Sequence, residues 1–179
     1  MHEYGDFPGA GDAEESEPVG GDEPRTTFPR SGAVGDMLFA YGTLQFAPVL
    51  EALLGRVPRS RLGVARGRRV AALPGRAYPG LVPAAGRIAA GLLLEGLTRA
   101  EWEILDRFED AEYDLRPIRL VLPPDGDEPG GTDVVPAYVW TAATTGADWR
   151  PEAFARANLA DYAQRCEHWR ASGMPSDGW

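Results

Sequence analysis

The sequence predicts an α+β fold, a small mixed β-barrel flanked by helices. Several short segments are apolar or alternate between apolar and polar residues, which is typical of strands. A few other segments carry helix start signals, and turns rich in Gly and Pro separate the elements. Short strands joined by such turns favour a small barrel. We expect one domain at residues 34–172, between an acidic N-terminal tail at 1–33 and a C-terminal tail at 173–179.

Five segments are expected to form strands. Two of them are short apolar runs, as in buried strands, and the stretch 116–122 alternates as a half-exposed strand does. The turn-rich stretch 123–131 lacks the ligand spacing and the final glutamate of an EF-hand, so we interpret it as a hairpin loop. The expected strands are Met37–Ala40, Val64–Leu73, Ile88–Leu94, Tyr113–Leu122 and Val134–Thr141.

Three helices are expected, at Gln45–Leu54, Thr98–Phe108 and Pro151–Arg170. The second has the clearest start, because Thr98 followed by Glu101 forms a capping box. Leu97 and Trp102 can add a hydrophobic staple around that cap. The third begins at a proline and carries an apolar stripe, which we interpret as core.

The net charge of −9 is concentrated at the N-terminus. Residues 1–33 contain eight acidic residues against Arg25 and Arg30, which leaves −6 there and −3 for the remainder. Such an acidic segment, rich in Gly and Pro, buries too little apolar surface to order, so we expect a disordered, solubilising tail. Docking to a partner is the alternative. Without a basic footprint, a nucleic-acid partner is not expected.

Composition also limits the class of protein. No run approaches the ~18 apolar residues of a membrane span, and the N-terminus is acidic and lacks an apolar segment. We therefore expect a cytoplasmic enzyme or binding protein with no membrane partner. One cysteine, Cys166, forms no internal disulfide, and the two histidines, His2 and His168, lie at opposite ends of the chain. A metal site is not expected.

The turn after the first expected strand is a candidate binding site. An apolar run ends abruptly at Tyr41, Gly42, Thr43 and Leu44. A glycine in such a turn permits unusual backbone angles, so that several N–H groups can point at one anionic or carbonyl ligand. Capping of the following helix is the simpler role for the Thr43 hydroxyl.

Glu109 is the candidate proton acceptor. At ~100° per residue it falls on the apolar side of the second helix with Trp102 and Leu105. Asp106 and Asp110 fall on the opposite, polar face. Partial burial makes a carboxylate a better proton acceptor near neutral pH. A glutamate on a frayed, exposed last turn is the alternative, and spacing alone does not decide between them.

Several motifs, in this order and spacing, resemble the γ-glutamylcyclotransferase-like superfamily, in particular its AIG2-like family and the γ-glutamylamine cyclotransferase branch. The resemblance covers about residues 36–165. The residues that carry it are Tyr41–Leu44, Tyr78–Leu81, Gly91, Leu105–Glu109 and Tyr113.

The resemblance implies a small β-barrel flanked by helices and an enzyme that needs no cofactor. It implies that Glu109 is the general acid and base, and that Tyr41–Leu44 bind the γ-glutamyl group of a small-molecule substrate. By the same analogy, Tyr113 is expected to contact the substrate. The substrate's own amine would attack its γ-carbonyl and release 5-oxoproline. The leaving amine and the oligomeric state remain open.

Two other functions stay open at this point: a non-catalytic module that binds a small metabolite in the same cavity, and a related amide hydrolase or acyltransferase. Three residues also have simpler interpretations. Tyr113 can serve only packing, Arg76 can be a solvated side chain instead of a ligand for a substrate carboxylate, and Cys166 is expected in the core. The stretch Tyr78–Leu81 is interpreted as a loop over the cavity or an ordinary turn.

Overall fold

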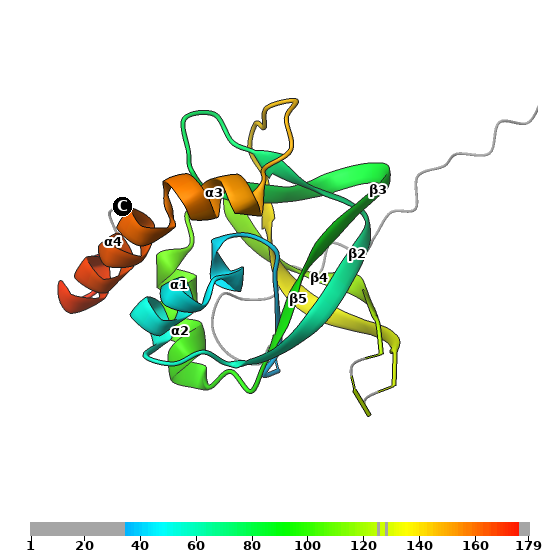
Figure 1. Ribbon diagram of the computed structural model, residues 1–179, viewed down its shortest axis with the longest axis horizontal. Coiled ribbons are helices and arrows are strands. Elements are labelled where there is room, and N and C mark those ends of the chain that lie inside the picture. The colour runs from blue at the N-terminus through cyan, green and yellow to red at the C-terminus, as the bar shows by residue number, and fades with distance from the viewer. Residues whose placement is uncertain (1–34, 125, 128, 176–179) are drawn as a thin grey trace, which may run out of the picture.

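The computed structural model describes residues 35–124, 126–127 and 129–175 (Figure 1). The expected acidic tail at 1–33 lies outside these residues. The described part of the chain forms five strands, four α-helices and one short 3-10 turn. Their order is β1 (Leu38–Ala40), η1 (Thr43–Gln45), α1 (Ala47–Leu54), β2 (Arg59–Ala72), β3 (Pro79–Glu95), α2 (Arg99–Phe108), β4 (Tyr113–Leu122), β5 (Gly131–Trp140), α3 (Pro151–Ala157) and α4 (Leu159–Ala171).

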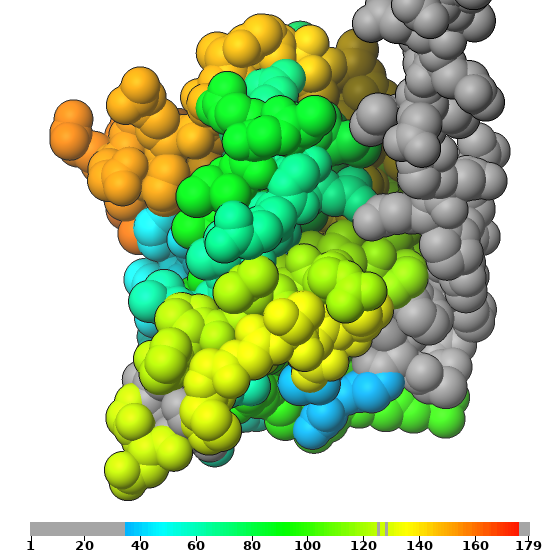
Figure 2. All heavy atoms as spheres, turned by 90° about the vertical axis from the view of Figure 1, so that its right-hand side faces the viewer, coloured from blue at the N-terminus to red at the C-terminus, as the bar shows by residue number. Residues whose placement is uncertain are grey.

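The strands form one curled sheet in the order β1-β3-β2-β4-β5, so the α+β prediction is confirmed. All four pairings are antiparallel, and no ladder among the described residues joins the edge strands β1 and β5. The expected small β-barrel flanked by helices is thus a curled, fully antiparallel sheet whose edges are not joined by a ladder. The two edge strands differ in length, with three residues in β1 and ten in β5. Figure 2 shows β3, β2, β4 and β5 side by side from top to bottom.

The central hairpin β2–β3 is longer than the sequence indicated, at 14 and 17 residues. In particular, Tyr78–Leu81 is not a loop, because Pro79 begins β3 and pairs with Ala72. A proline is tolerated there because the first residue of a strand can do without its N–H. Gly80 is needed for packing, since a Cβ on it would lie 2.5 Å from Cβ of Trp140 on β5.

The α-helices gather on one side of the sheet (Figure 1). The side chains of the edge strand β1 alternate between two cores. Leu38 and Ala40 belong to the core shared with the helices, whereas Phe39 and Tyr41 belong to the core inside the curl of the sheet. Because both faces of β1 are covered, an apolar run without alternation is what this strand requires.

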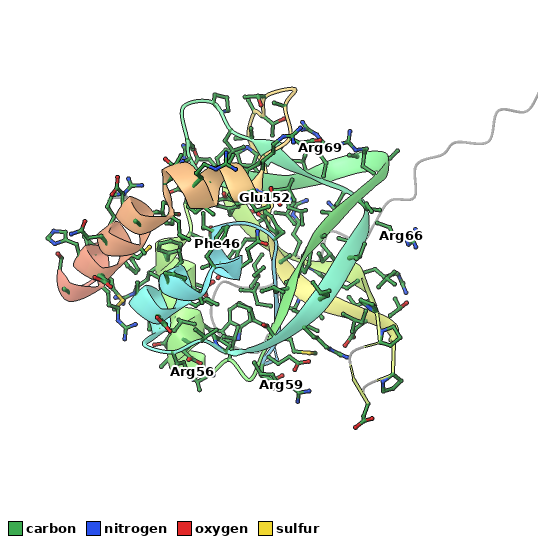
Figure 3. The ribbon with its side chains drawn as sticks, viewed as in Figure 1. Phe46, Arg56, Arg59, Arg66, Arg69 and Glu152 are labelled. Carbon is green, nitrogen blue, oxygen red and sulfur yellow. The ribbon has the colours of Figure 1, made fainter. Side chains whose placement is uncertain are left out.

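The start of α2 has the capping box that the sequence predicts. The side chain of Thr98 accepts from the N–H of Glu101, and the carboxylate of Glu101 accepts from the N–H of Thr98 at 2.7 Å. Arg56, two residues after the end of α1 (Figure 3), adds two hydrogen bonds to the same carboxylate at 2.6 and 2.8 Å. Leu97 and Trp102 are buried beside the cap, as the expected staple requires. Glu101 thus ties α1 to α2.

The third expected helix is divided into α3 and α4 at Asn158. Asn158 leaves the helical region with φ −131° and ψ −21°, and its side chain makes no capping hydrogen bond. The apolar stripe is core as expected: Phe154, Cys166 and Trp169 are buried. The division turns α4 so that it packs against α1.

We predict that Glu101→Gln weakens the loss of unfolding free energy that occurs as the pH falls. The hydrogen bonds from Arg56 lower the pKa of Glu101 below its ordinary value of 4.5, so the stabilisation is present above that pH and is lost as the pH falls through the lowered value. Unfolding free energies from urea titrations between about pH 7 and pH 3 should fall less steeply in the variant. The control is Glu103→Gln, whose side chain is 57% exposed, and an equal flattening there would contradict the assignment.

Candidate active site

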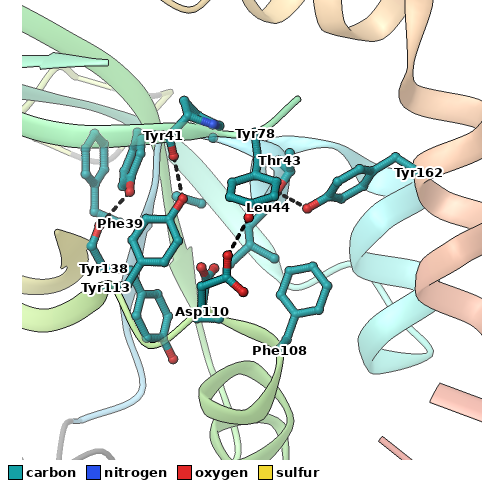
Figure 4. A pocket seen from close by; sticks show the side chains of 14 residues that line it. Phe39, Tyr41, Thr43, Leu44, Tyr78, Phe108, Asp110, Tyr113, Tyr138 and Tyr162 are labelled. Atoms are coloured by element: carbon teal, nitrogen blue, oxygen red, sulfur yellow. Dashed lines mark hydrogen bonds between the residues drawn. The ribbon is translucent and has the colours of Figure 1, made fainter. Parts of the chain in front are cut away.

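A pocket opens where β1 ends, and five tyrosines and two carboxylates line it (Figure 4). Its volume is about 440 Å³, counting the open mouth. The buried hydroxyl-bearing side chains form the floor, and half-buried residues form the rim. The tyrosines are Tyr41, Tyr78, Tyr113, Tyr138 and Tyr162, and the carboxylates are Glu109 and Asp110.

The predicted binding turn, Tyr41–Leu44, forms one wall of the pocket. Gly42 has φ −113°, outside the left-handed region, so it is not required for a positive φ. It is required for space, because a Cβ there would lie 2.9 Å from Cγ of Pro79. No side chain caps η1, so the first N–H groups of this turn, at Thr43 and Leu44, have no cap acceptor.

Tyr41 supports the turn from below. Its buried hydroxyl donates to the backbone carbonyl of Tyr138 at 2.6 Å and so links the end of β1 to β5 across the open seam of the sheet. Burial, and then the charge of Glu109, hold the pKa of the Tyr41 hydroxyl well above 10.0, while a hydrogen bond from the backbone of Leu81 acts in the opposite direction. The Tyr41 hydroxyl therefore keeps its proton, which it donates to the carbonyl of Tyr138.

Tyr113 has a similar role on the opposite side. Its hydroxyl donates to the carbonyl of Pro79 at 2.6 Å, and its ring packs edge-on against Trp140 with centroids 4.9 Å apart. Burial raises the pKa of Tyr113, with smaller contributions from Tyr41 and Glu109. Tyr113 lines the pocket, and its hydroxyl holds the start of β3 in place.

Thr43 faces the pocket instead of capping a helix, which corrects the simpler role expected for it. Its side chain is buried, and its Oγ1 lies 3.4 Å from the hydroxyl of Tyr162 on α4. Burial raises the pKa of Tyr162 well above 10.0. Sequence reasoning placed Tyr162 in the apolar stripe of the last helix and missed its contact with the pocket. The signal was available, because a buried tyrosine hydroxyl needs a polar partner.

Glu109 lies in the same pocket as the turn. It is the C-cap residue of α2, with extended backbone angles, and its N–H donates to the carbonyl of Leu105 at 3.0 Å. Its side chain is half-buried. Its charge raises the pKa values of three tyrosines from three other segments, namely Tyr41, Tyr113 and Tyr162. Glu109 therefore lines the pocket from an ordered helix end, close enough to these tyrosines for its charge to act on them.

Asp110 and Arg76 are placed differently from the expectation. Because α2 ends at Phe108, the helical angle that put Asp110 on the polar face does not apply to it. Asp110 lines the pocket and accepts hydrogen bonds from Arg76 and from the hydroxyl of Tyr78. Asp106 is also expected on the polar face, but its carboxylate accepts a hydrogen bond from the hydroxyl of Tyr138 at 2.7 Å. Tyr78 and Asp110 thus form the rim of the pocket.

The described part of the chain contains no group of three or more His, Cys, Asp or Glu side chains placed to hold a metal ion. Cys166 is buried, and burial raises the pKa of its thiol to about 12, which fits a core residue and not a nucleophile. None of the helices in the described ranges is long and apolar enough for a membrane span.

Two solved structures share this fold. A solution structure of an Arabidopsis thaliana protein aligns with TM-score 0.56 and 23% identity over 82% of this chain and 98% of that one. A structure of a gamma-glutamyl cyclotransferase aligns with TM-score 0.52 and 11% identity over 74% of this chain and 86% of that one. The fold is thus that of cyclotransferase-like proteins.

The chain belongs to the family described as gamma-glutamyl cyclotransferase, AIG2-like, which matches residues 38–162. AIG2-like protein C of Arabidopsis thaliana is 36% identical over 110 residues, 62% of each chain. AIG2-like protein B of the same plant is 27% identical over 127 residues, 71% of this chain and 73% of the relative. The chain therefore matches less than two thirds of protein C.

We predict that Tyr41→Phe destabilises the protein more than Tyr138→Phe. The first substitution leaves a buried carbonyl without its donor, which costs about 1–3 kcal/mol. The second removes a donor to Asp106, which is only half-buried and can bind water instead. Urea unfolding of both variants measures the difference, and equal losses would contradict a special role for the Tyr41 bond across the seam.

Proposed function

We propose that this chain releases 5-oxoproline from a γ-glutamyl amide by intramolecular aminolysis, with Glu109 as the general acid and base. One observation carries the proposal: the half-buried carboxylate of Glu109 shares a pocket with the turn Tyr41–Leu44 and faces three buried tyrosines. Family membership supports the same reaction class.

In the proposed reaction, Glu109 takes one proton from the α-ammonium group of the substrate. The free amine then attacks the γ-carbonyl carbon, and a C–N bond forms that closes a five-membered ring. The negative charge that develops on the γ-carbonyl oxygen needs fixed donors, and the N–H groups of Thr43 and Leu44 lie in the pocket wall. The attacking nitrogen gives its second proton to water, and Glu109 returns its own proton to the leaving nitrogen as the original amide bond breaks, so that a neutral amine leaves.

The surroundings favour Glu109 over other bases. The tyrosines on the floor keep their protons at neutral pH, because burial raises their pKa values. The thiol of Cys166 stays protonated for the same reason. Asp110 accepts hydrogen bonds from Arg76 and Tyr78 at the rim. Glu109 is the other carboxylate of the pocket lining, and its place at the end of a capped helix fixes its backbone.

The pocket also suits a reaction in which both reacting groups belong to one molecule. Its wall and floor are tied together by the bonds of Tyr41 and Tyr113 to backbone carbonyls. A fixed cavity can hold the γ-glutamyl group folded, with its amine near its γ-carbonyl, which removes much of the entropic barrier. The leaving group extends past the rim, and its identity is not part of this proposal.

We predict that Glu109→Gln lowers 5-oxoproline release by at least ~100-fold, the usual range for loss of a general acid and base. The substrates are γ-glutamyl amino acids, γ-glutamyl-ε-lysine and simple γ-glutamyl amines, and released 5-oxoproline is quantified by mass spectrometry. The control is Glu103→Gln on the exposed face of α2, which should keep normal turnover.

The same experiment separates the alternatives. Substrates whose α-amine is acetylated cannot cyclise, so hydrolysis that continues with them would indicate an amide hydrolase. Binding of substrates without release of any product would indicate a metabolite-binding module. Full activity in folded Glu109→Gln would remove this residue from its proposed role.

A further inference from the structure

Four charged and polar side chains at the rim of the pocket form one cluster. Arg76 and Tyr78 come from the segment between β2 and β3, and Asp110 and Glu112 come from the turn between α2 and β4. Arg76 donates to Asp110 and to the Tyr78 oxygen, Tyr78 donates to Asp110, and Arg76 donates to Glu112 at 2.8 Å. Figure 4 shows the Tyr78–Asp110 bond across the pocket.

The guanidinium group of Arg76 is held on several sides. It lies 5.2 Å from the ring centre of Trp140 and 5.5 Å from that of Tyr78, within the range of cation–π attraction. Its side chain is 32% exposed, compared with 85% for Arg99 in the surface ion pair with Glu103. A cation fixed in this way interacts with its carboxylate partners more strongly than a solvated surface pair does.

We propose that Arg76 is a positioning residue of this site: it neutralises Asp110 beside the base Glu109 and, together with Asp110, holds Tyr78 at the rim of the pocket. The inference rests on the proposed function for its meaning in catalysis. It gives a role to Arg76, expected as a solvated side chain, to Tyr78, expected in a loop or turn, and to Asp110, expected on the polar face of a helix.

The reason is electrostatic. Glu109 and Asp110 are consecutive residues that line one pocket, and like charges in a shared site disfavour the ionised form of both. Arg76 compensates the charge of Asp110, so that Glu109 can ionise and accept a proton. The other titratable groups around the pocket are five tyrosine hydroxyls, which come from the β1 turn, the segment before β3, β4, β5 and α4, and two further carboxylates. They are Tyr41, Tyr78, Tyr113, Tyr138, Tyr162, Asp106 and Glu112.

The test is the pH dependence of turnover in a set of charge variants. In Arg76→Met, the uncompensated Asp110 should move the acid limb of kcat/KM to higher pH by about one unit. In Asp110→Asn, the remaining cation should move that limb to lower pH. The double variant should return close to the wild type, because both charges are gone. Arg76→Lys keeps the cation and should restore the pH profile, with a higher KM because Tyr78 loses the planar donor that holds it.

A second measurement does not depend on turnover. The side-chain carboxyl carbon of Glu109 can be followed by ¹³C NMR in the full chain without substrate, and Glu109→Gln identifies its signal. Its titration should move up in Arg76→Met and down in Asp110→Asn. The matched control is Arg99→Met, which removes an exposed ion pair and should move neither the NMR titration nor the pH profile.

The outcomes are separable. If no γ-glutamyl substrate turns over while the NMR titrations shift as stated, the proposed reaction fails and the electrostatic role of Arg76 stands. If the titration of Glu109 is the same in the wild type and in Asp110→Asn, and in any folded Arg76→Met, the inference is overturned. The Asp110→Asn arm decides the question even if Arg76→Met does not fold.

Discussion

The close approach of Gly42 to Pro79 is the contact on which the site depends. It brings the end of β1 against the start of β3, because nothing larger than hydrogen fits on the Cα of Gly42. The carbonyl of Pro79 is in turn fixed by the hydroxyl of Tyr113. Three parts of the pocket thus meet at Pro79: the turn Tyr41–Leu44, the start of β3, and Tyr113 from β4. The pocket lies between them.

The buried hydroxyl groups on the floor of the pocket all need hydrogen-bond partners. A cavity between two apolar cores is a poor place for hydroxyl groups, and unpaired buried hydroxyls are costly. Here Tyr41 and Tyr113 donate to backbone carbonyls at 2.6 Å each, and Tyr162 pairs with Thr43. Each bond also joins segments far apart in the chain. The polar groups therefore fix the shape of the cavity, and the surrounding apolar packing keeps them protonated.

Local signals in the sequence predicted the parts of this structure that local physics decides. The capping box at Thr98 and Glu101 depends only on residues three apart, and it is present. The helical angle placed Glu109 on the pocket side, because the helix runs almost to that residue. The same reasoning failed one residue later for Asp110, where the helix has ended and the partner Arg76 comes from another segment.

Tertiary pairing explains the other differences. The start of β3 at Pro79 depends on Ala72 across the hairpin and on Trp140 across the sheet, and neither contact has a local sequence signal. The sheet edges are likewise a tertiary feature: β1 ends at Ala40, the chain turns at η1, and no ladder among the described residues joins β1 to β5. The predicted roles of the site residues concern chemistry, and the fold places these residues together without deciding what they do.

The burial of Cys166 has a practical consequence. It is the one cysteine of the chain, it lies in α4 with no exposed surface, and its thiol has a pKa of about 12. Alkylating reagents attack the thiolate, so they can modify this residue only when α4 separates from the core. The rate of alkylation is therefore a built-in probe of how often the helix that carries Tyr162 opens, and no label has to be introduced to read it.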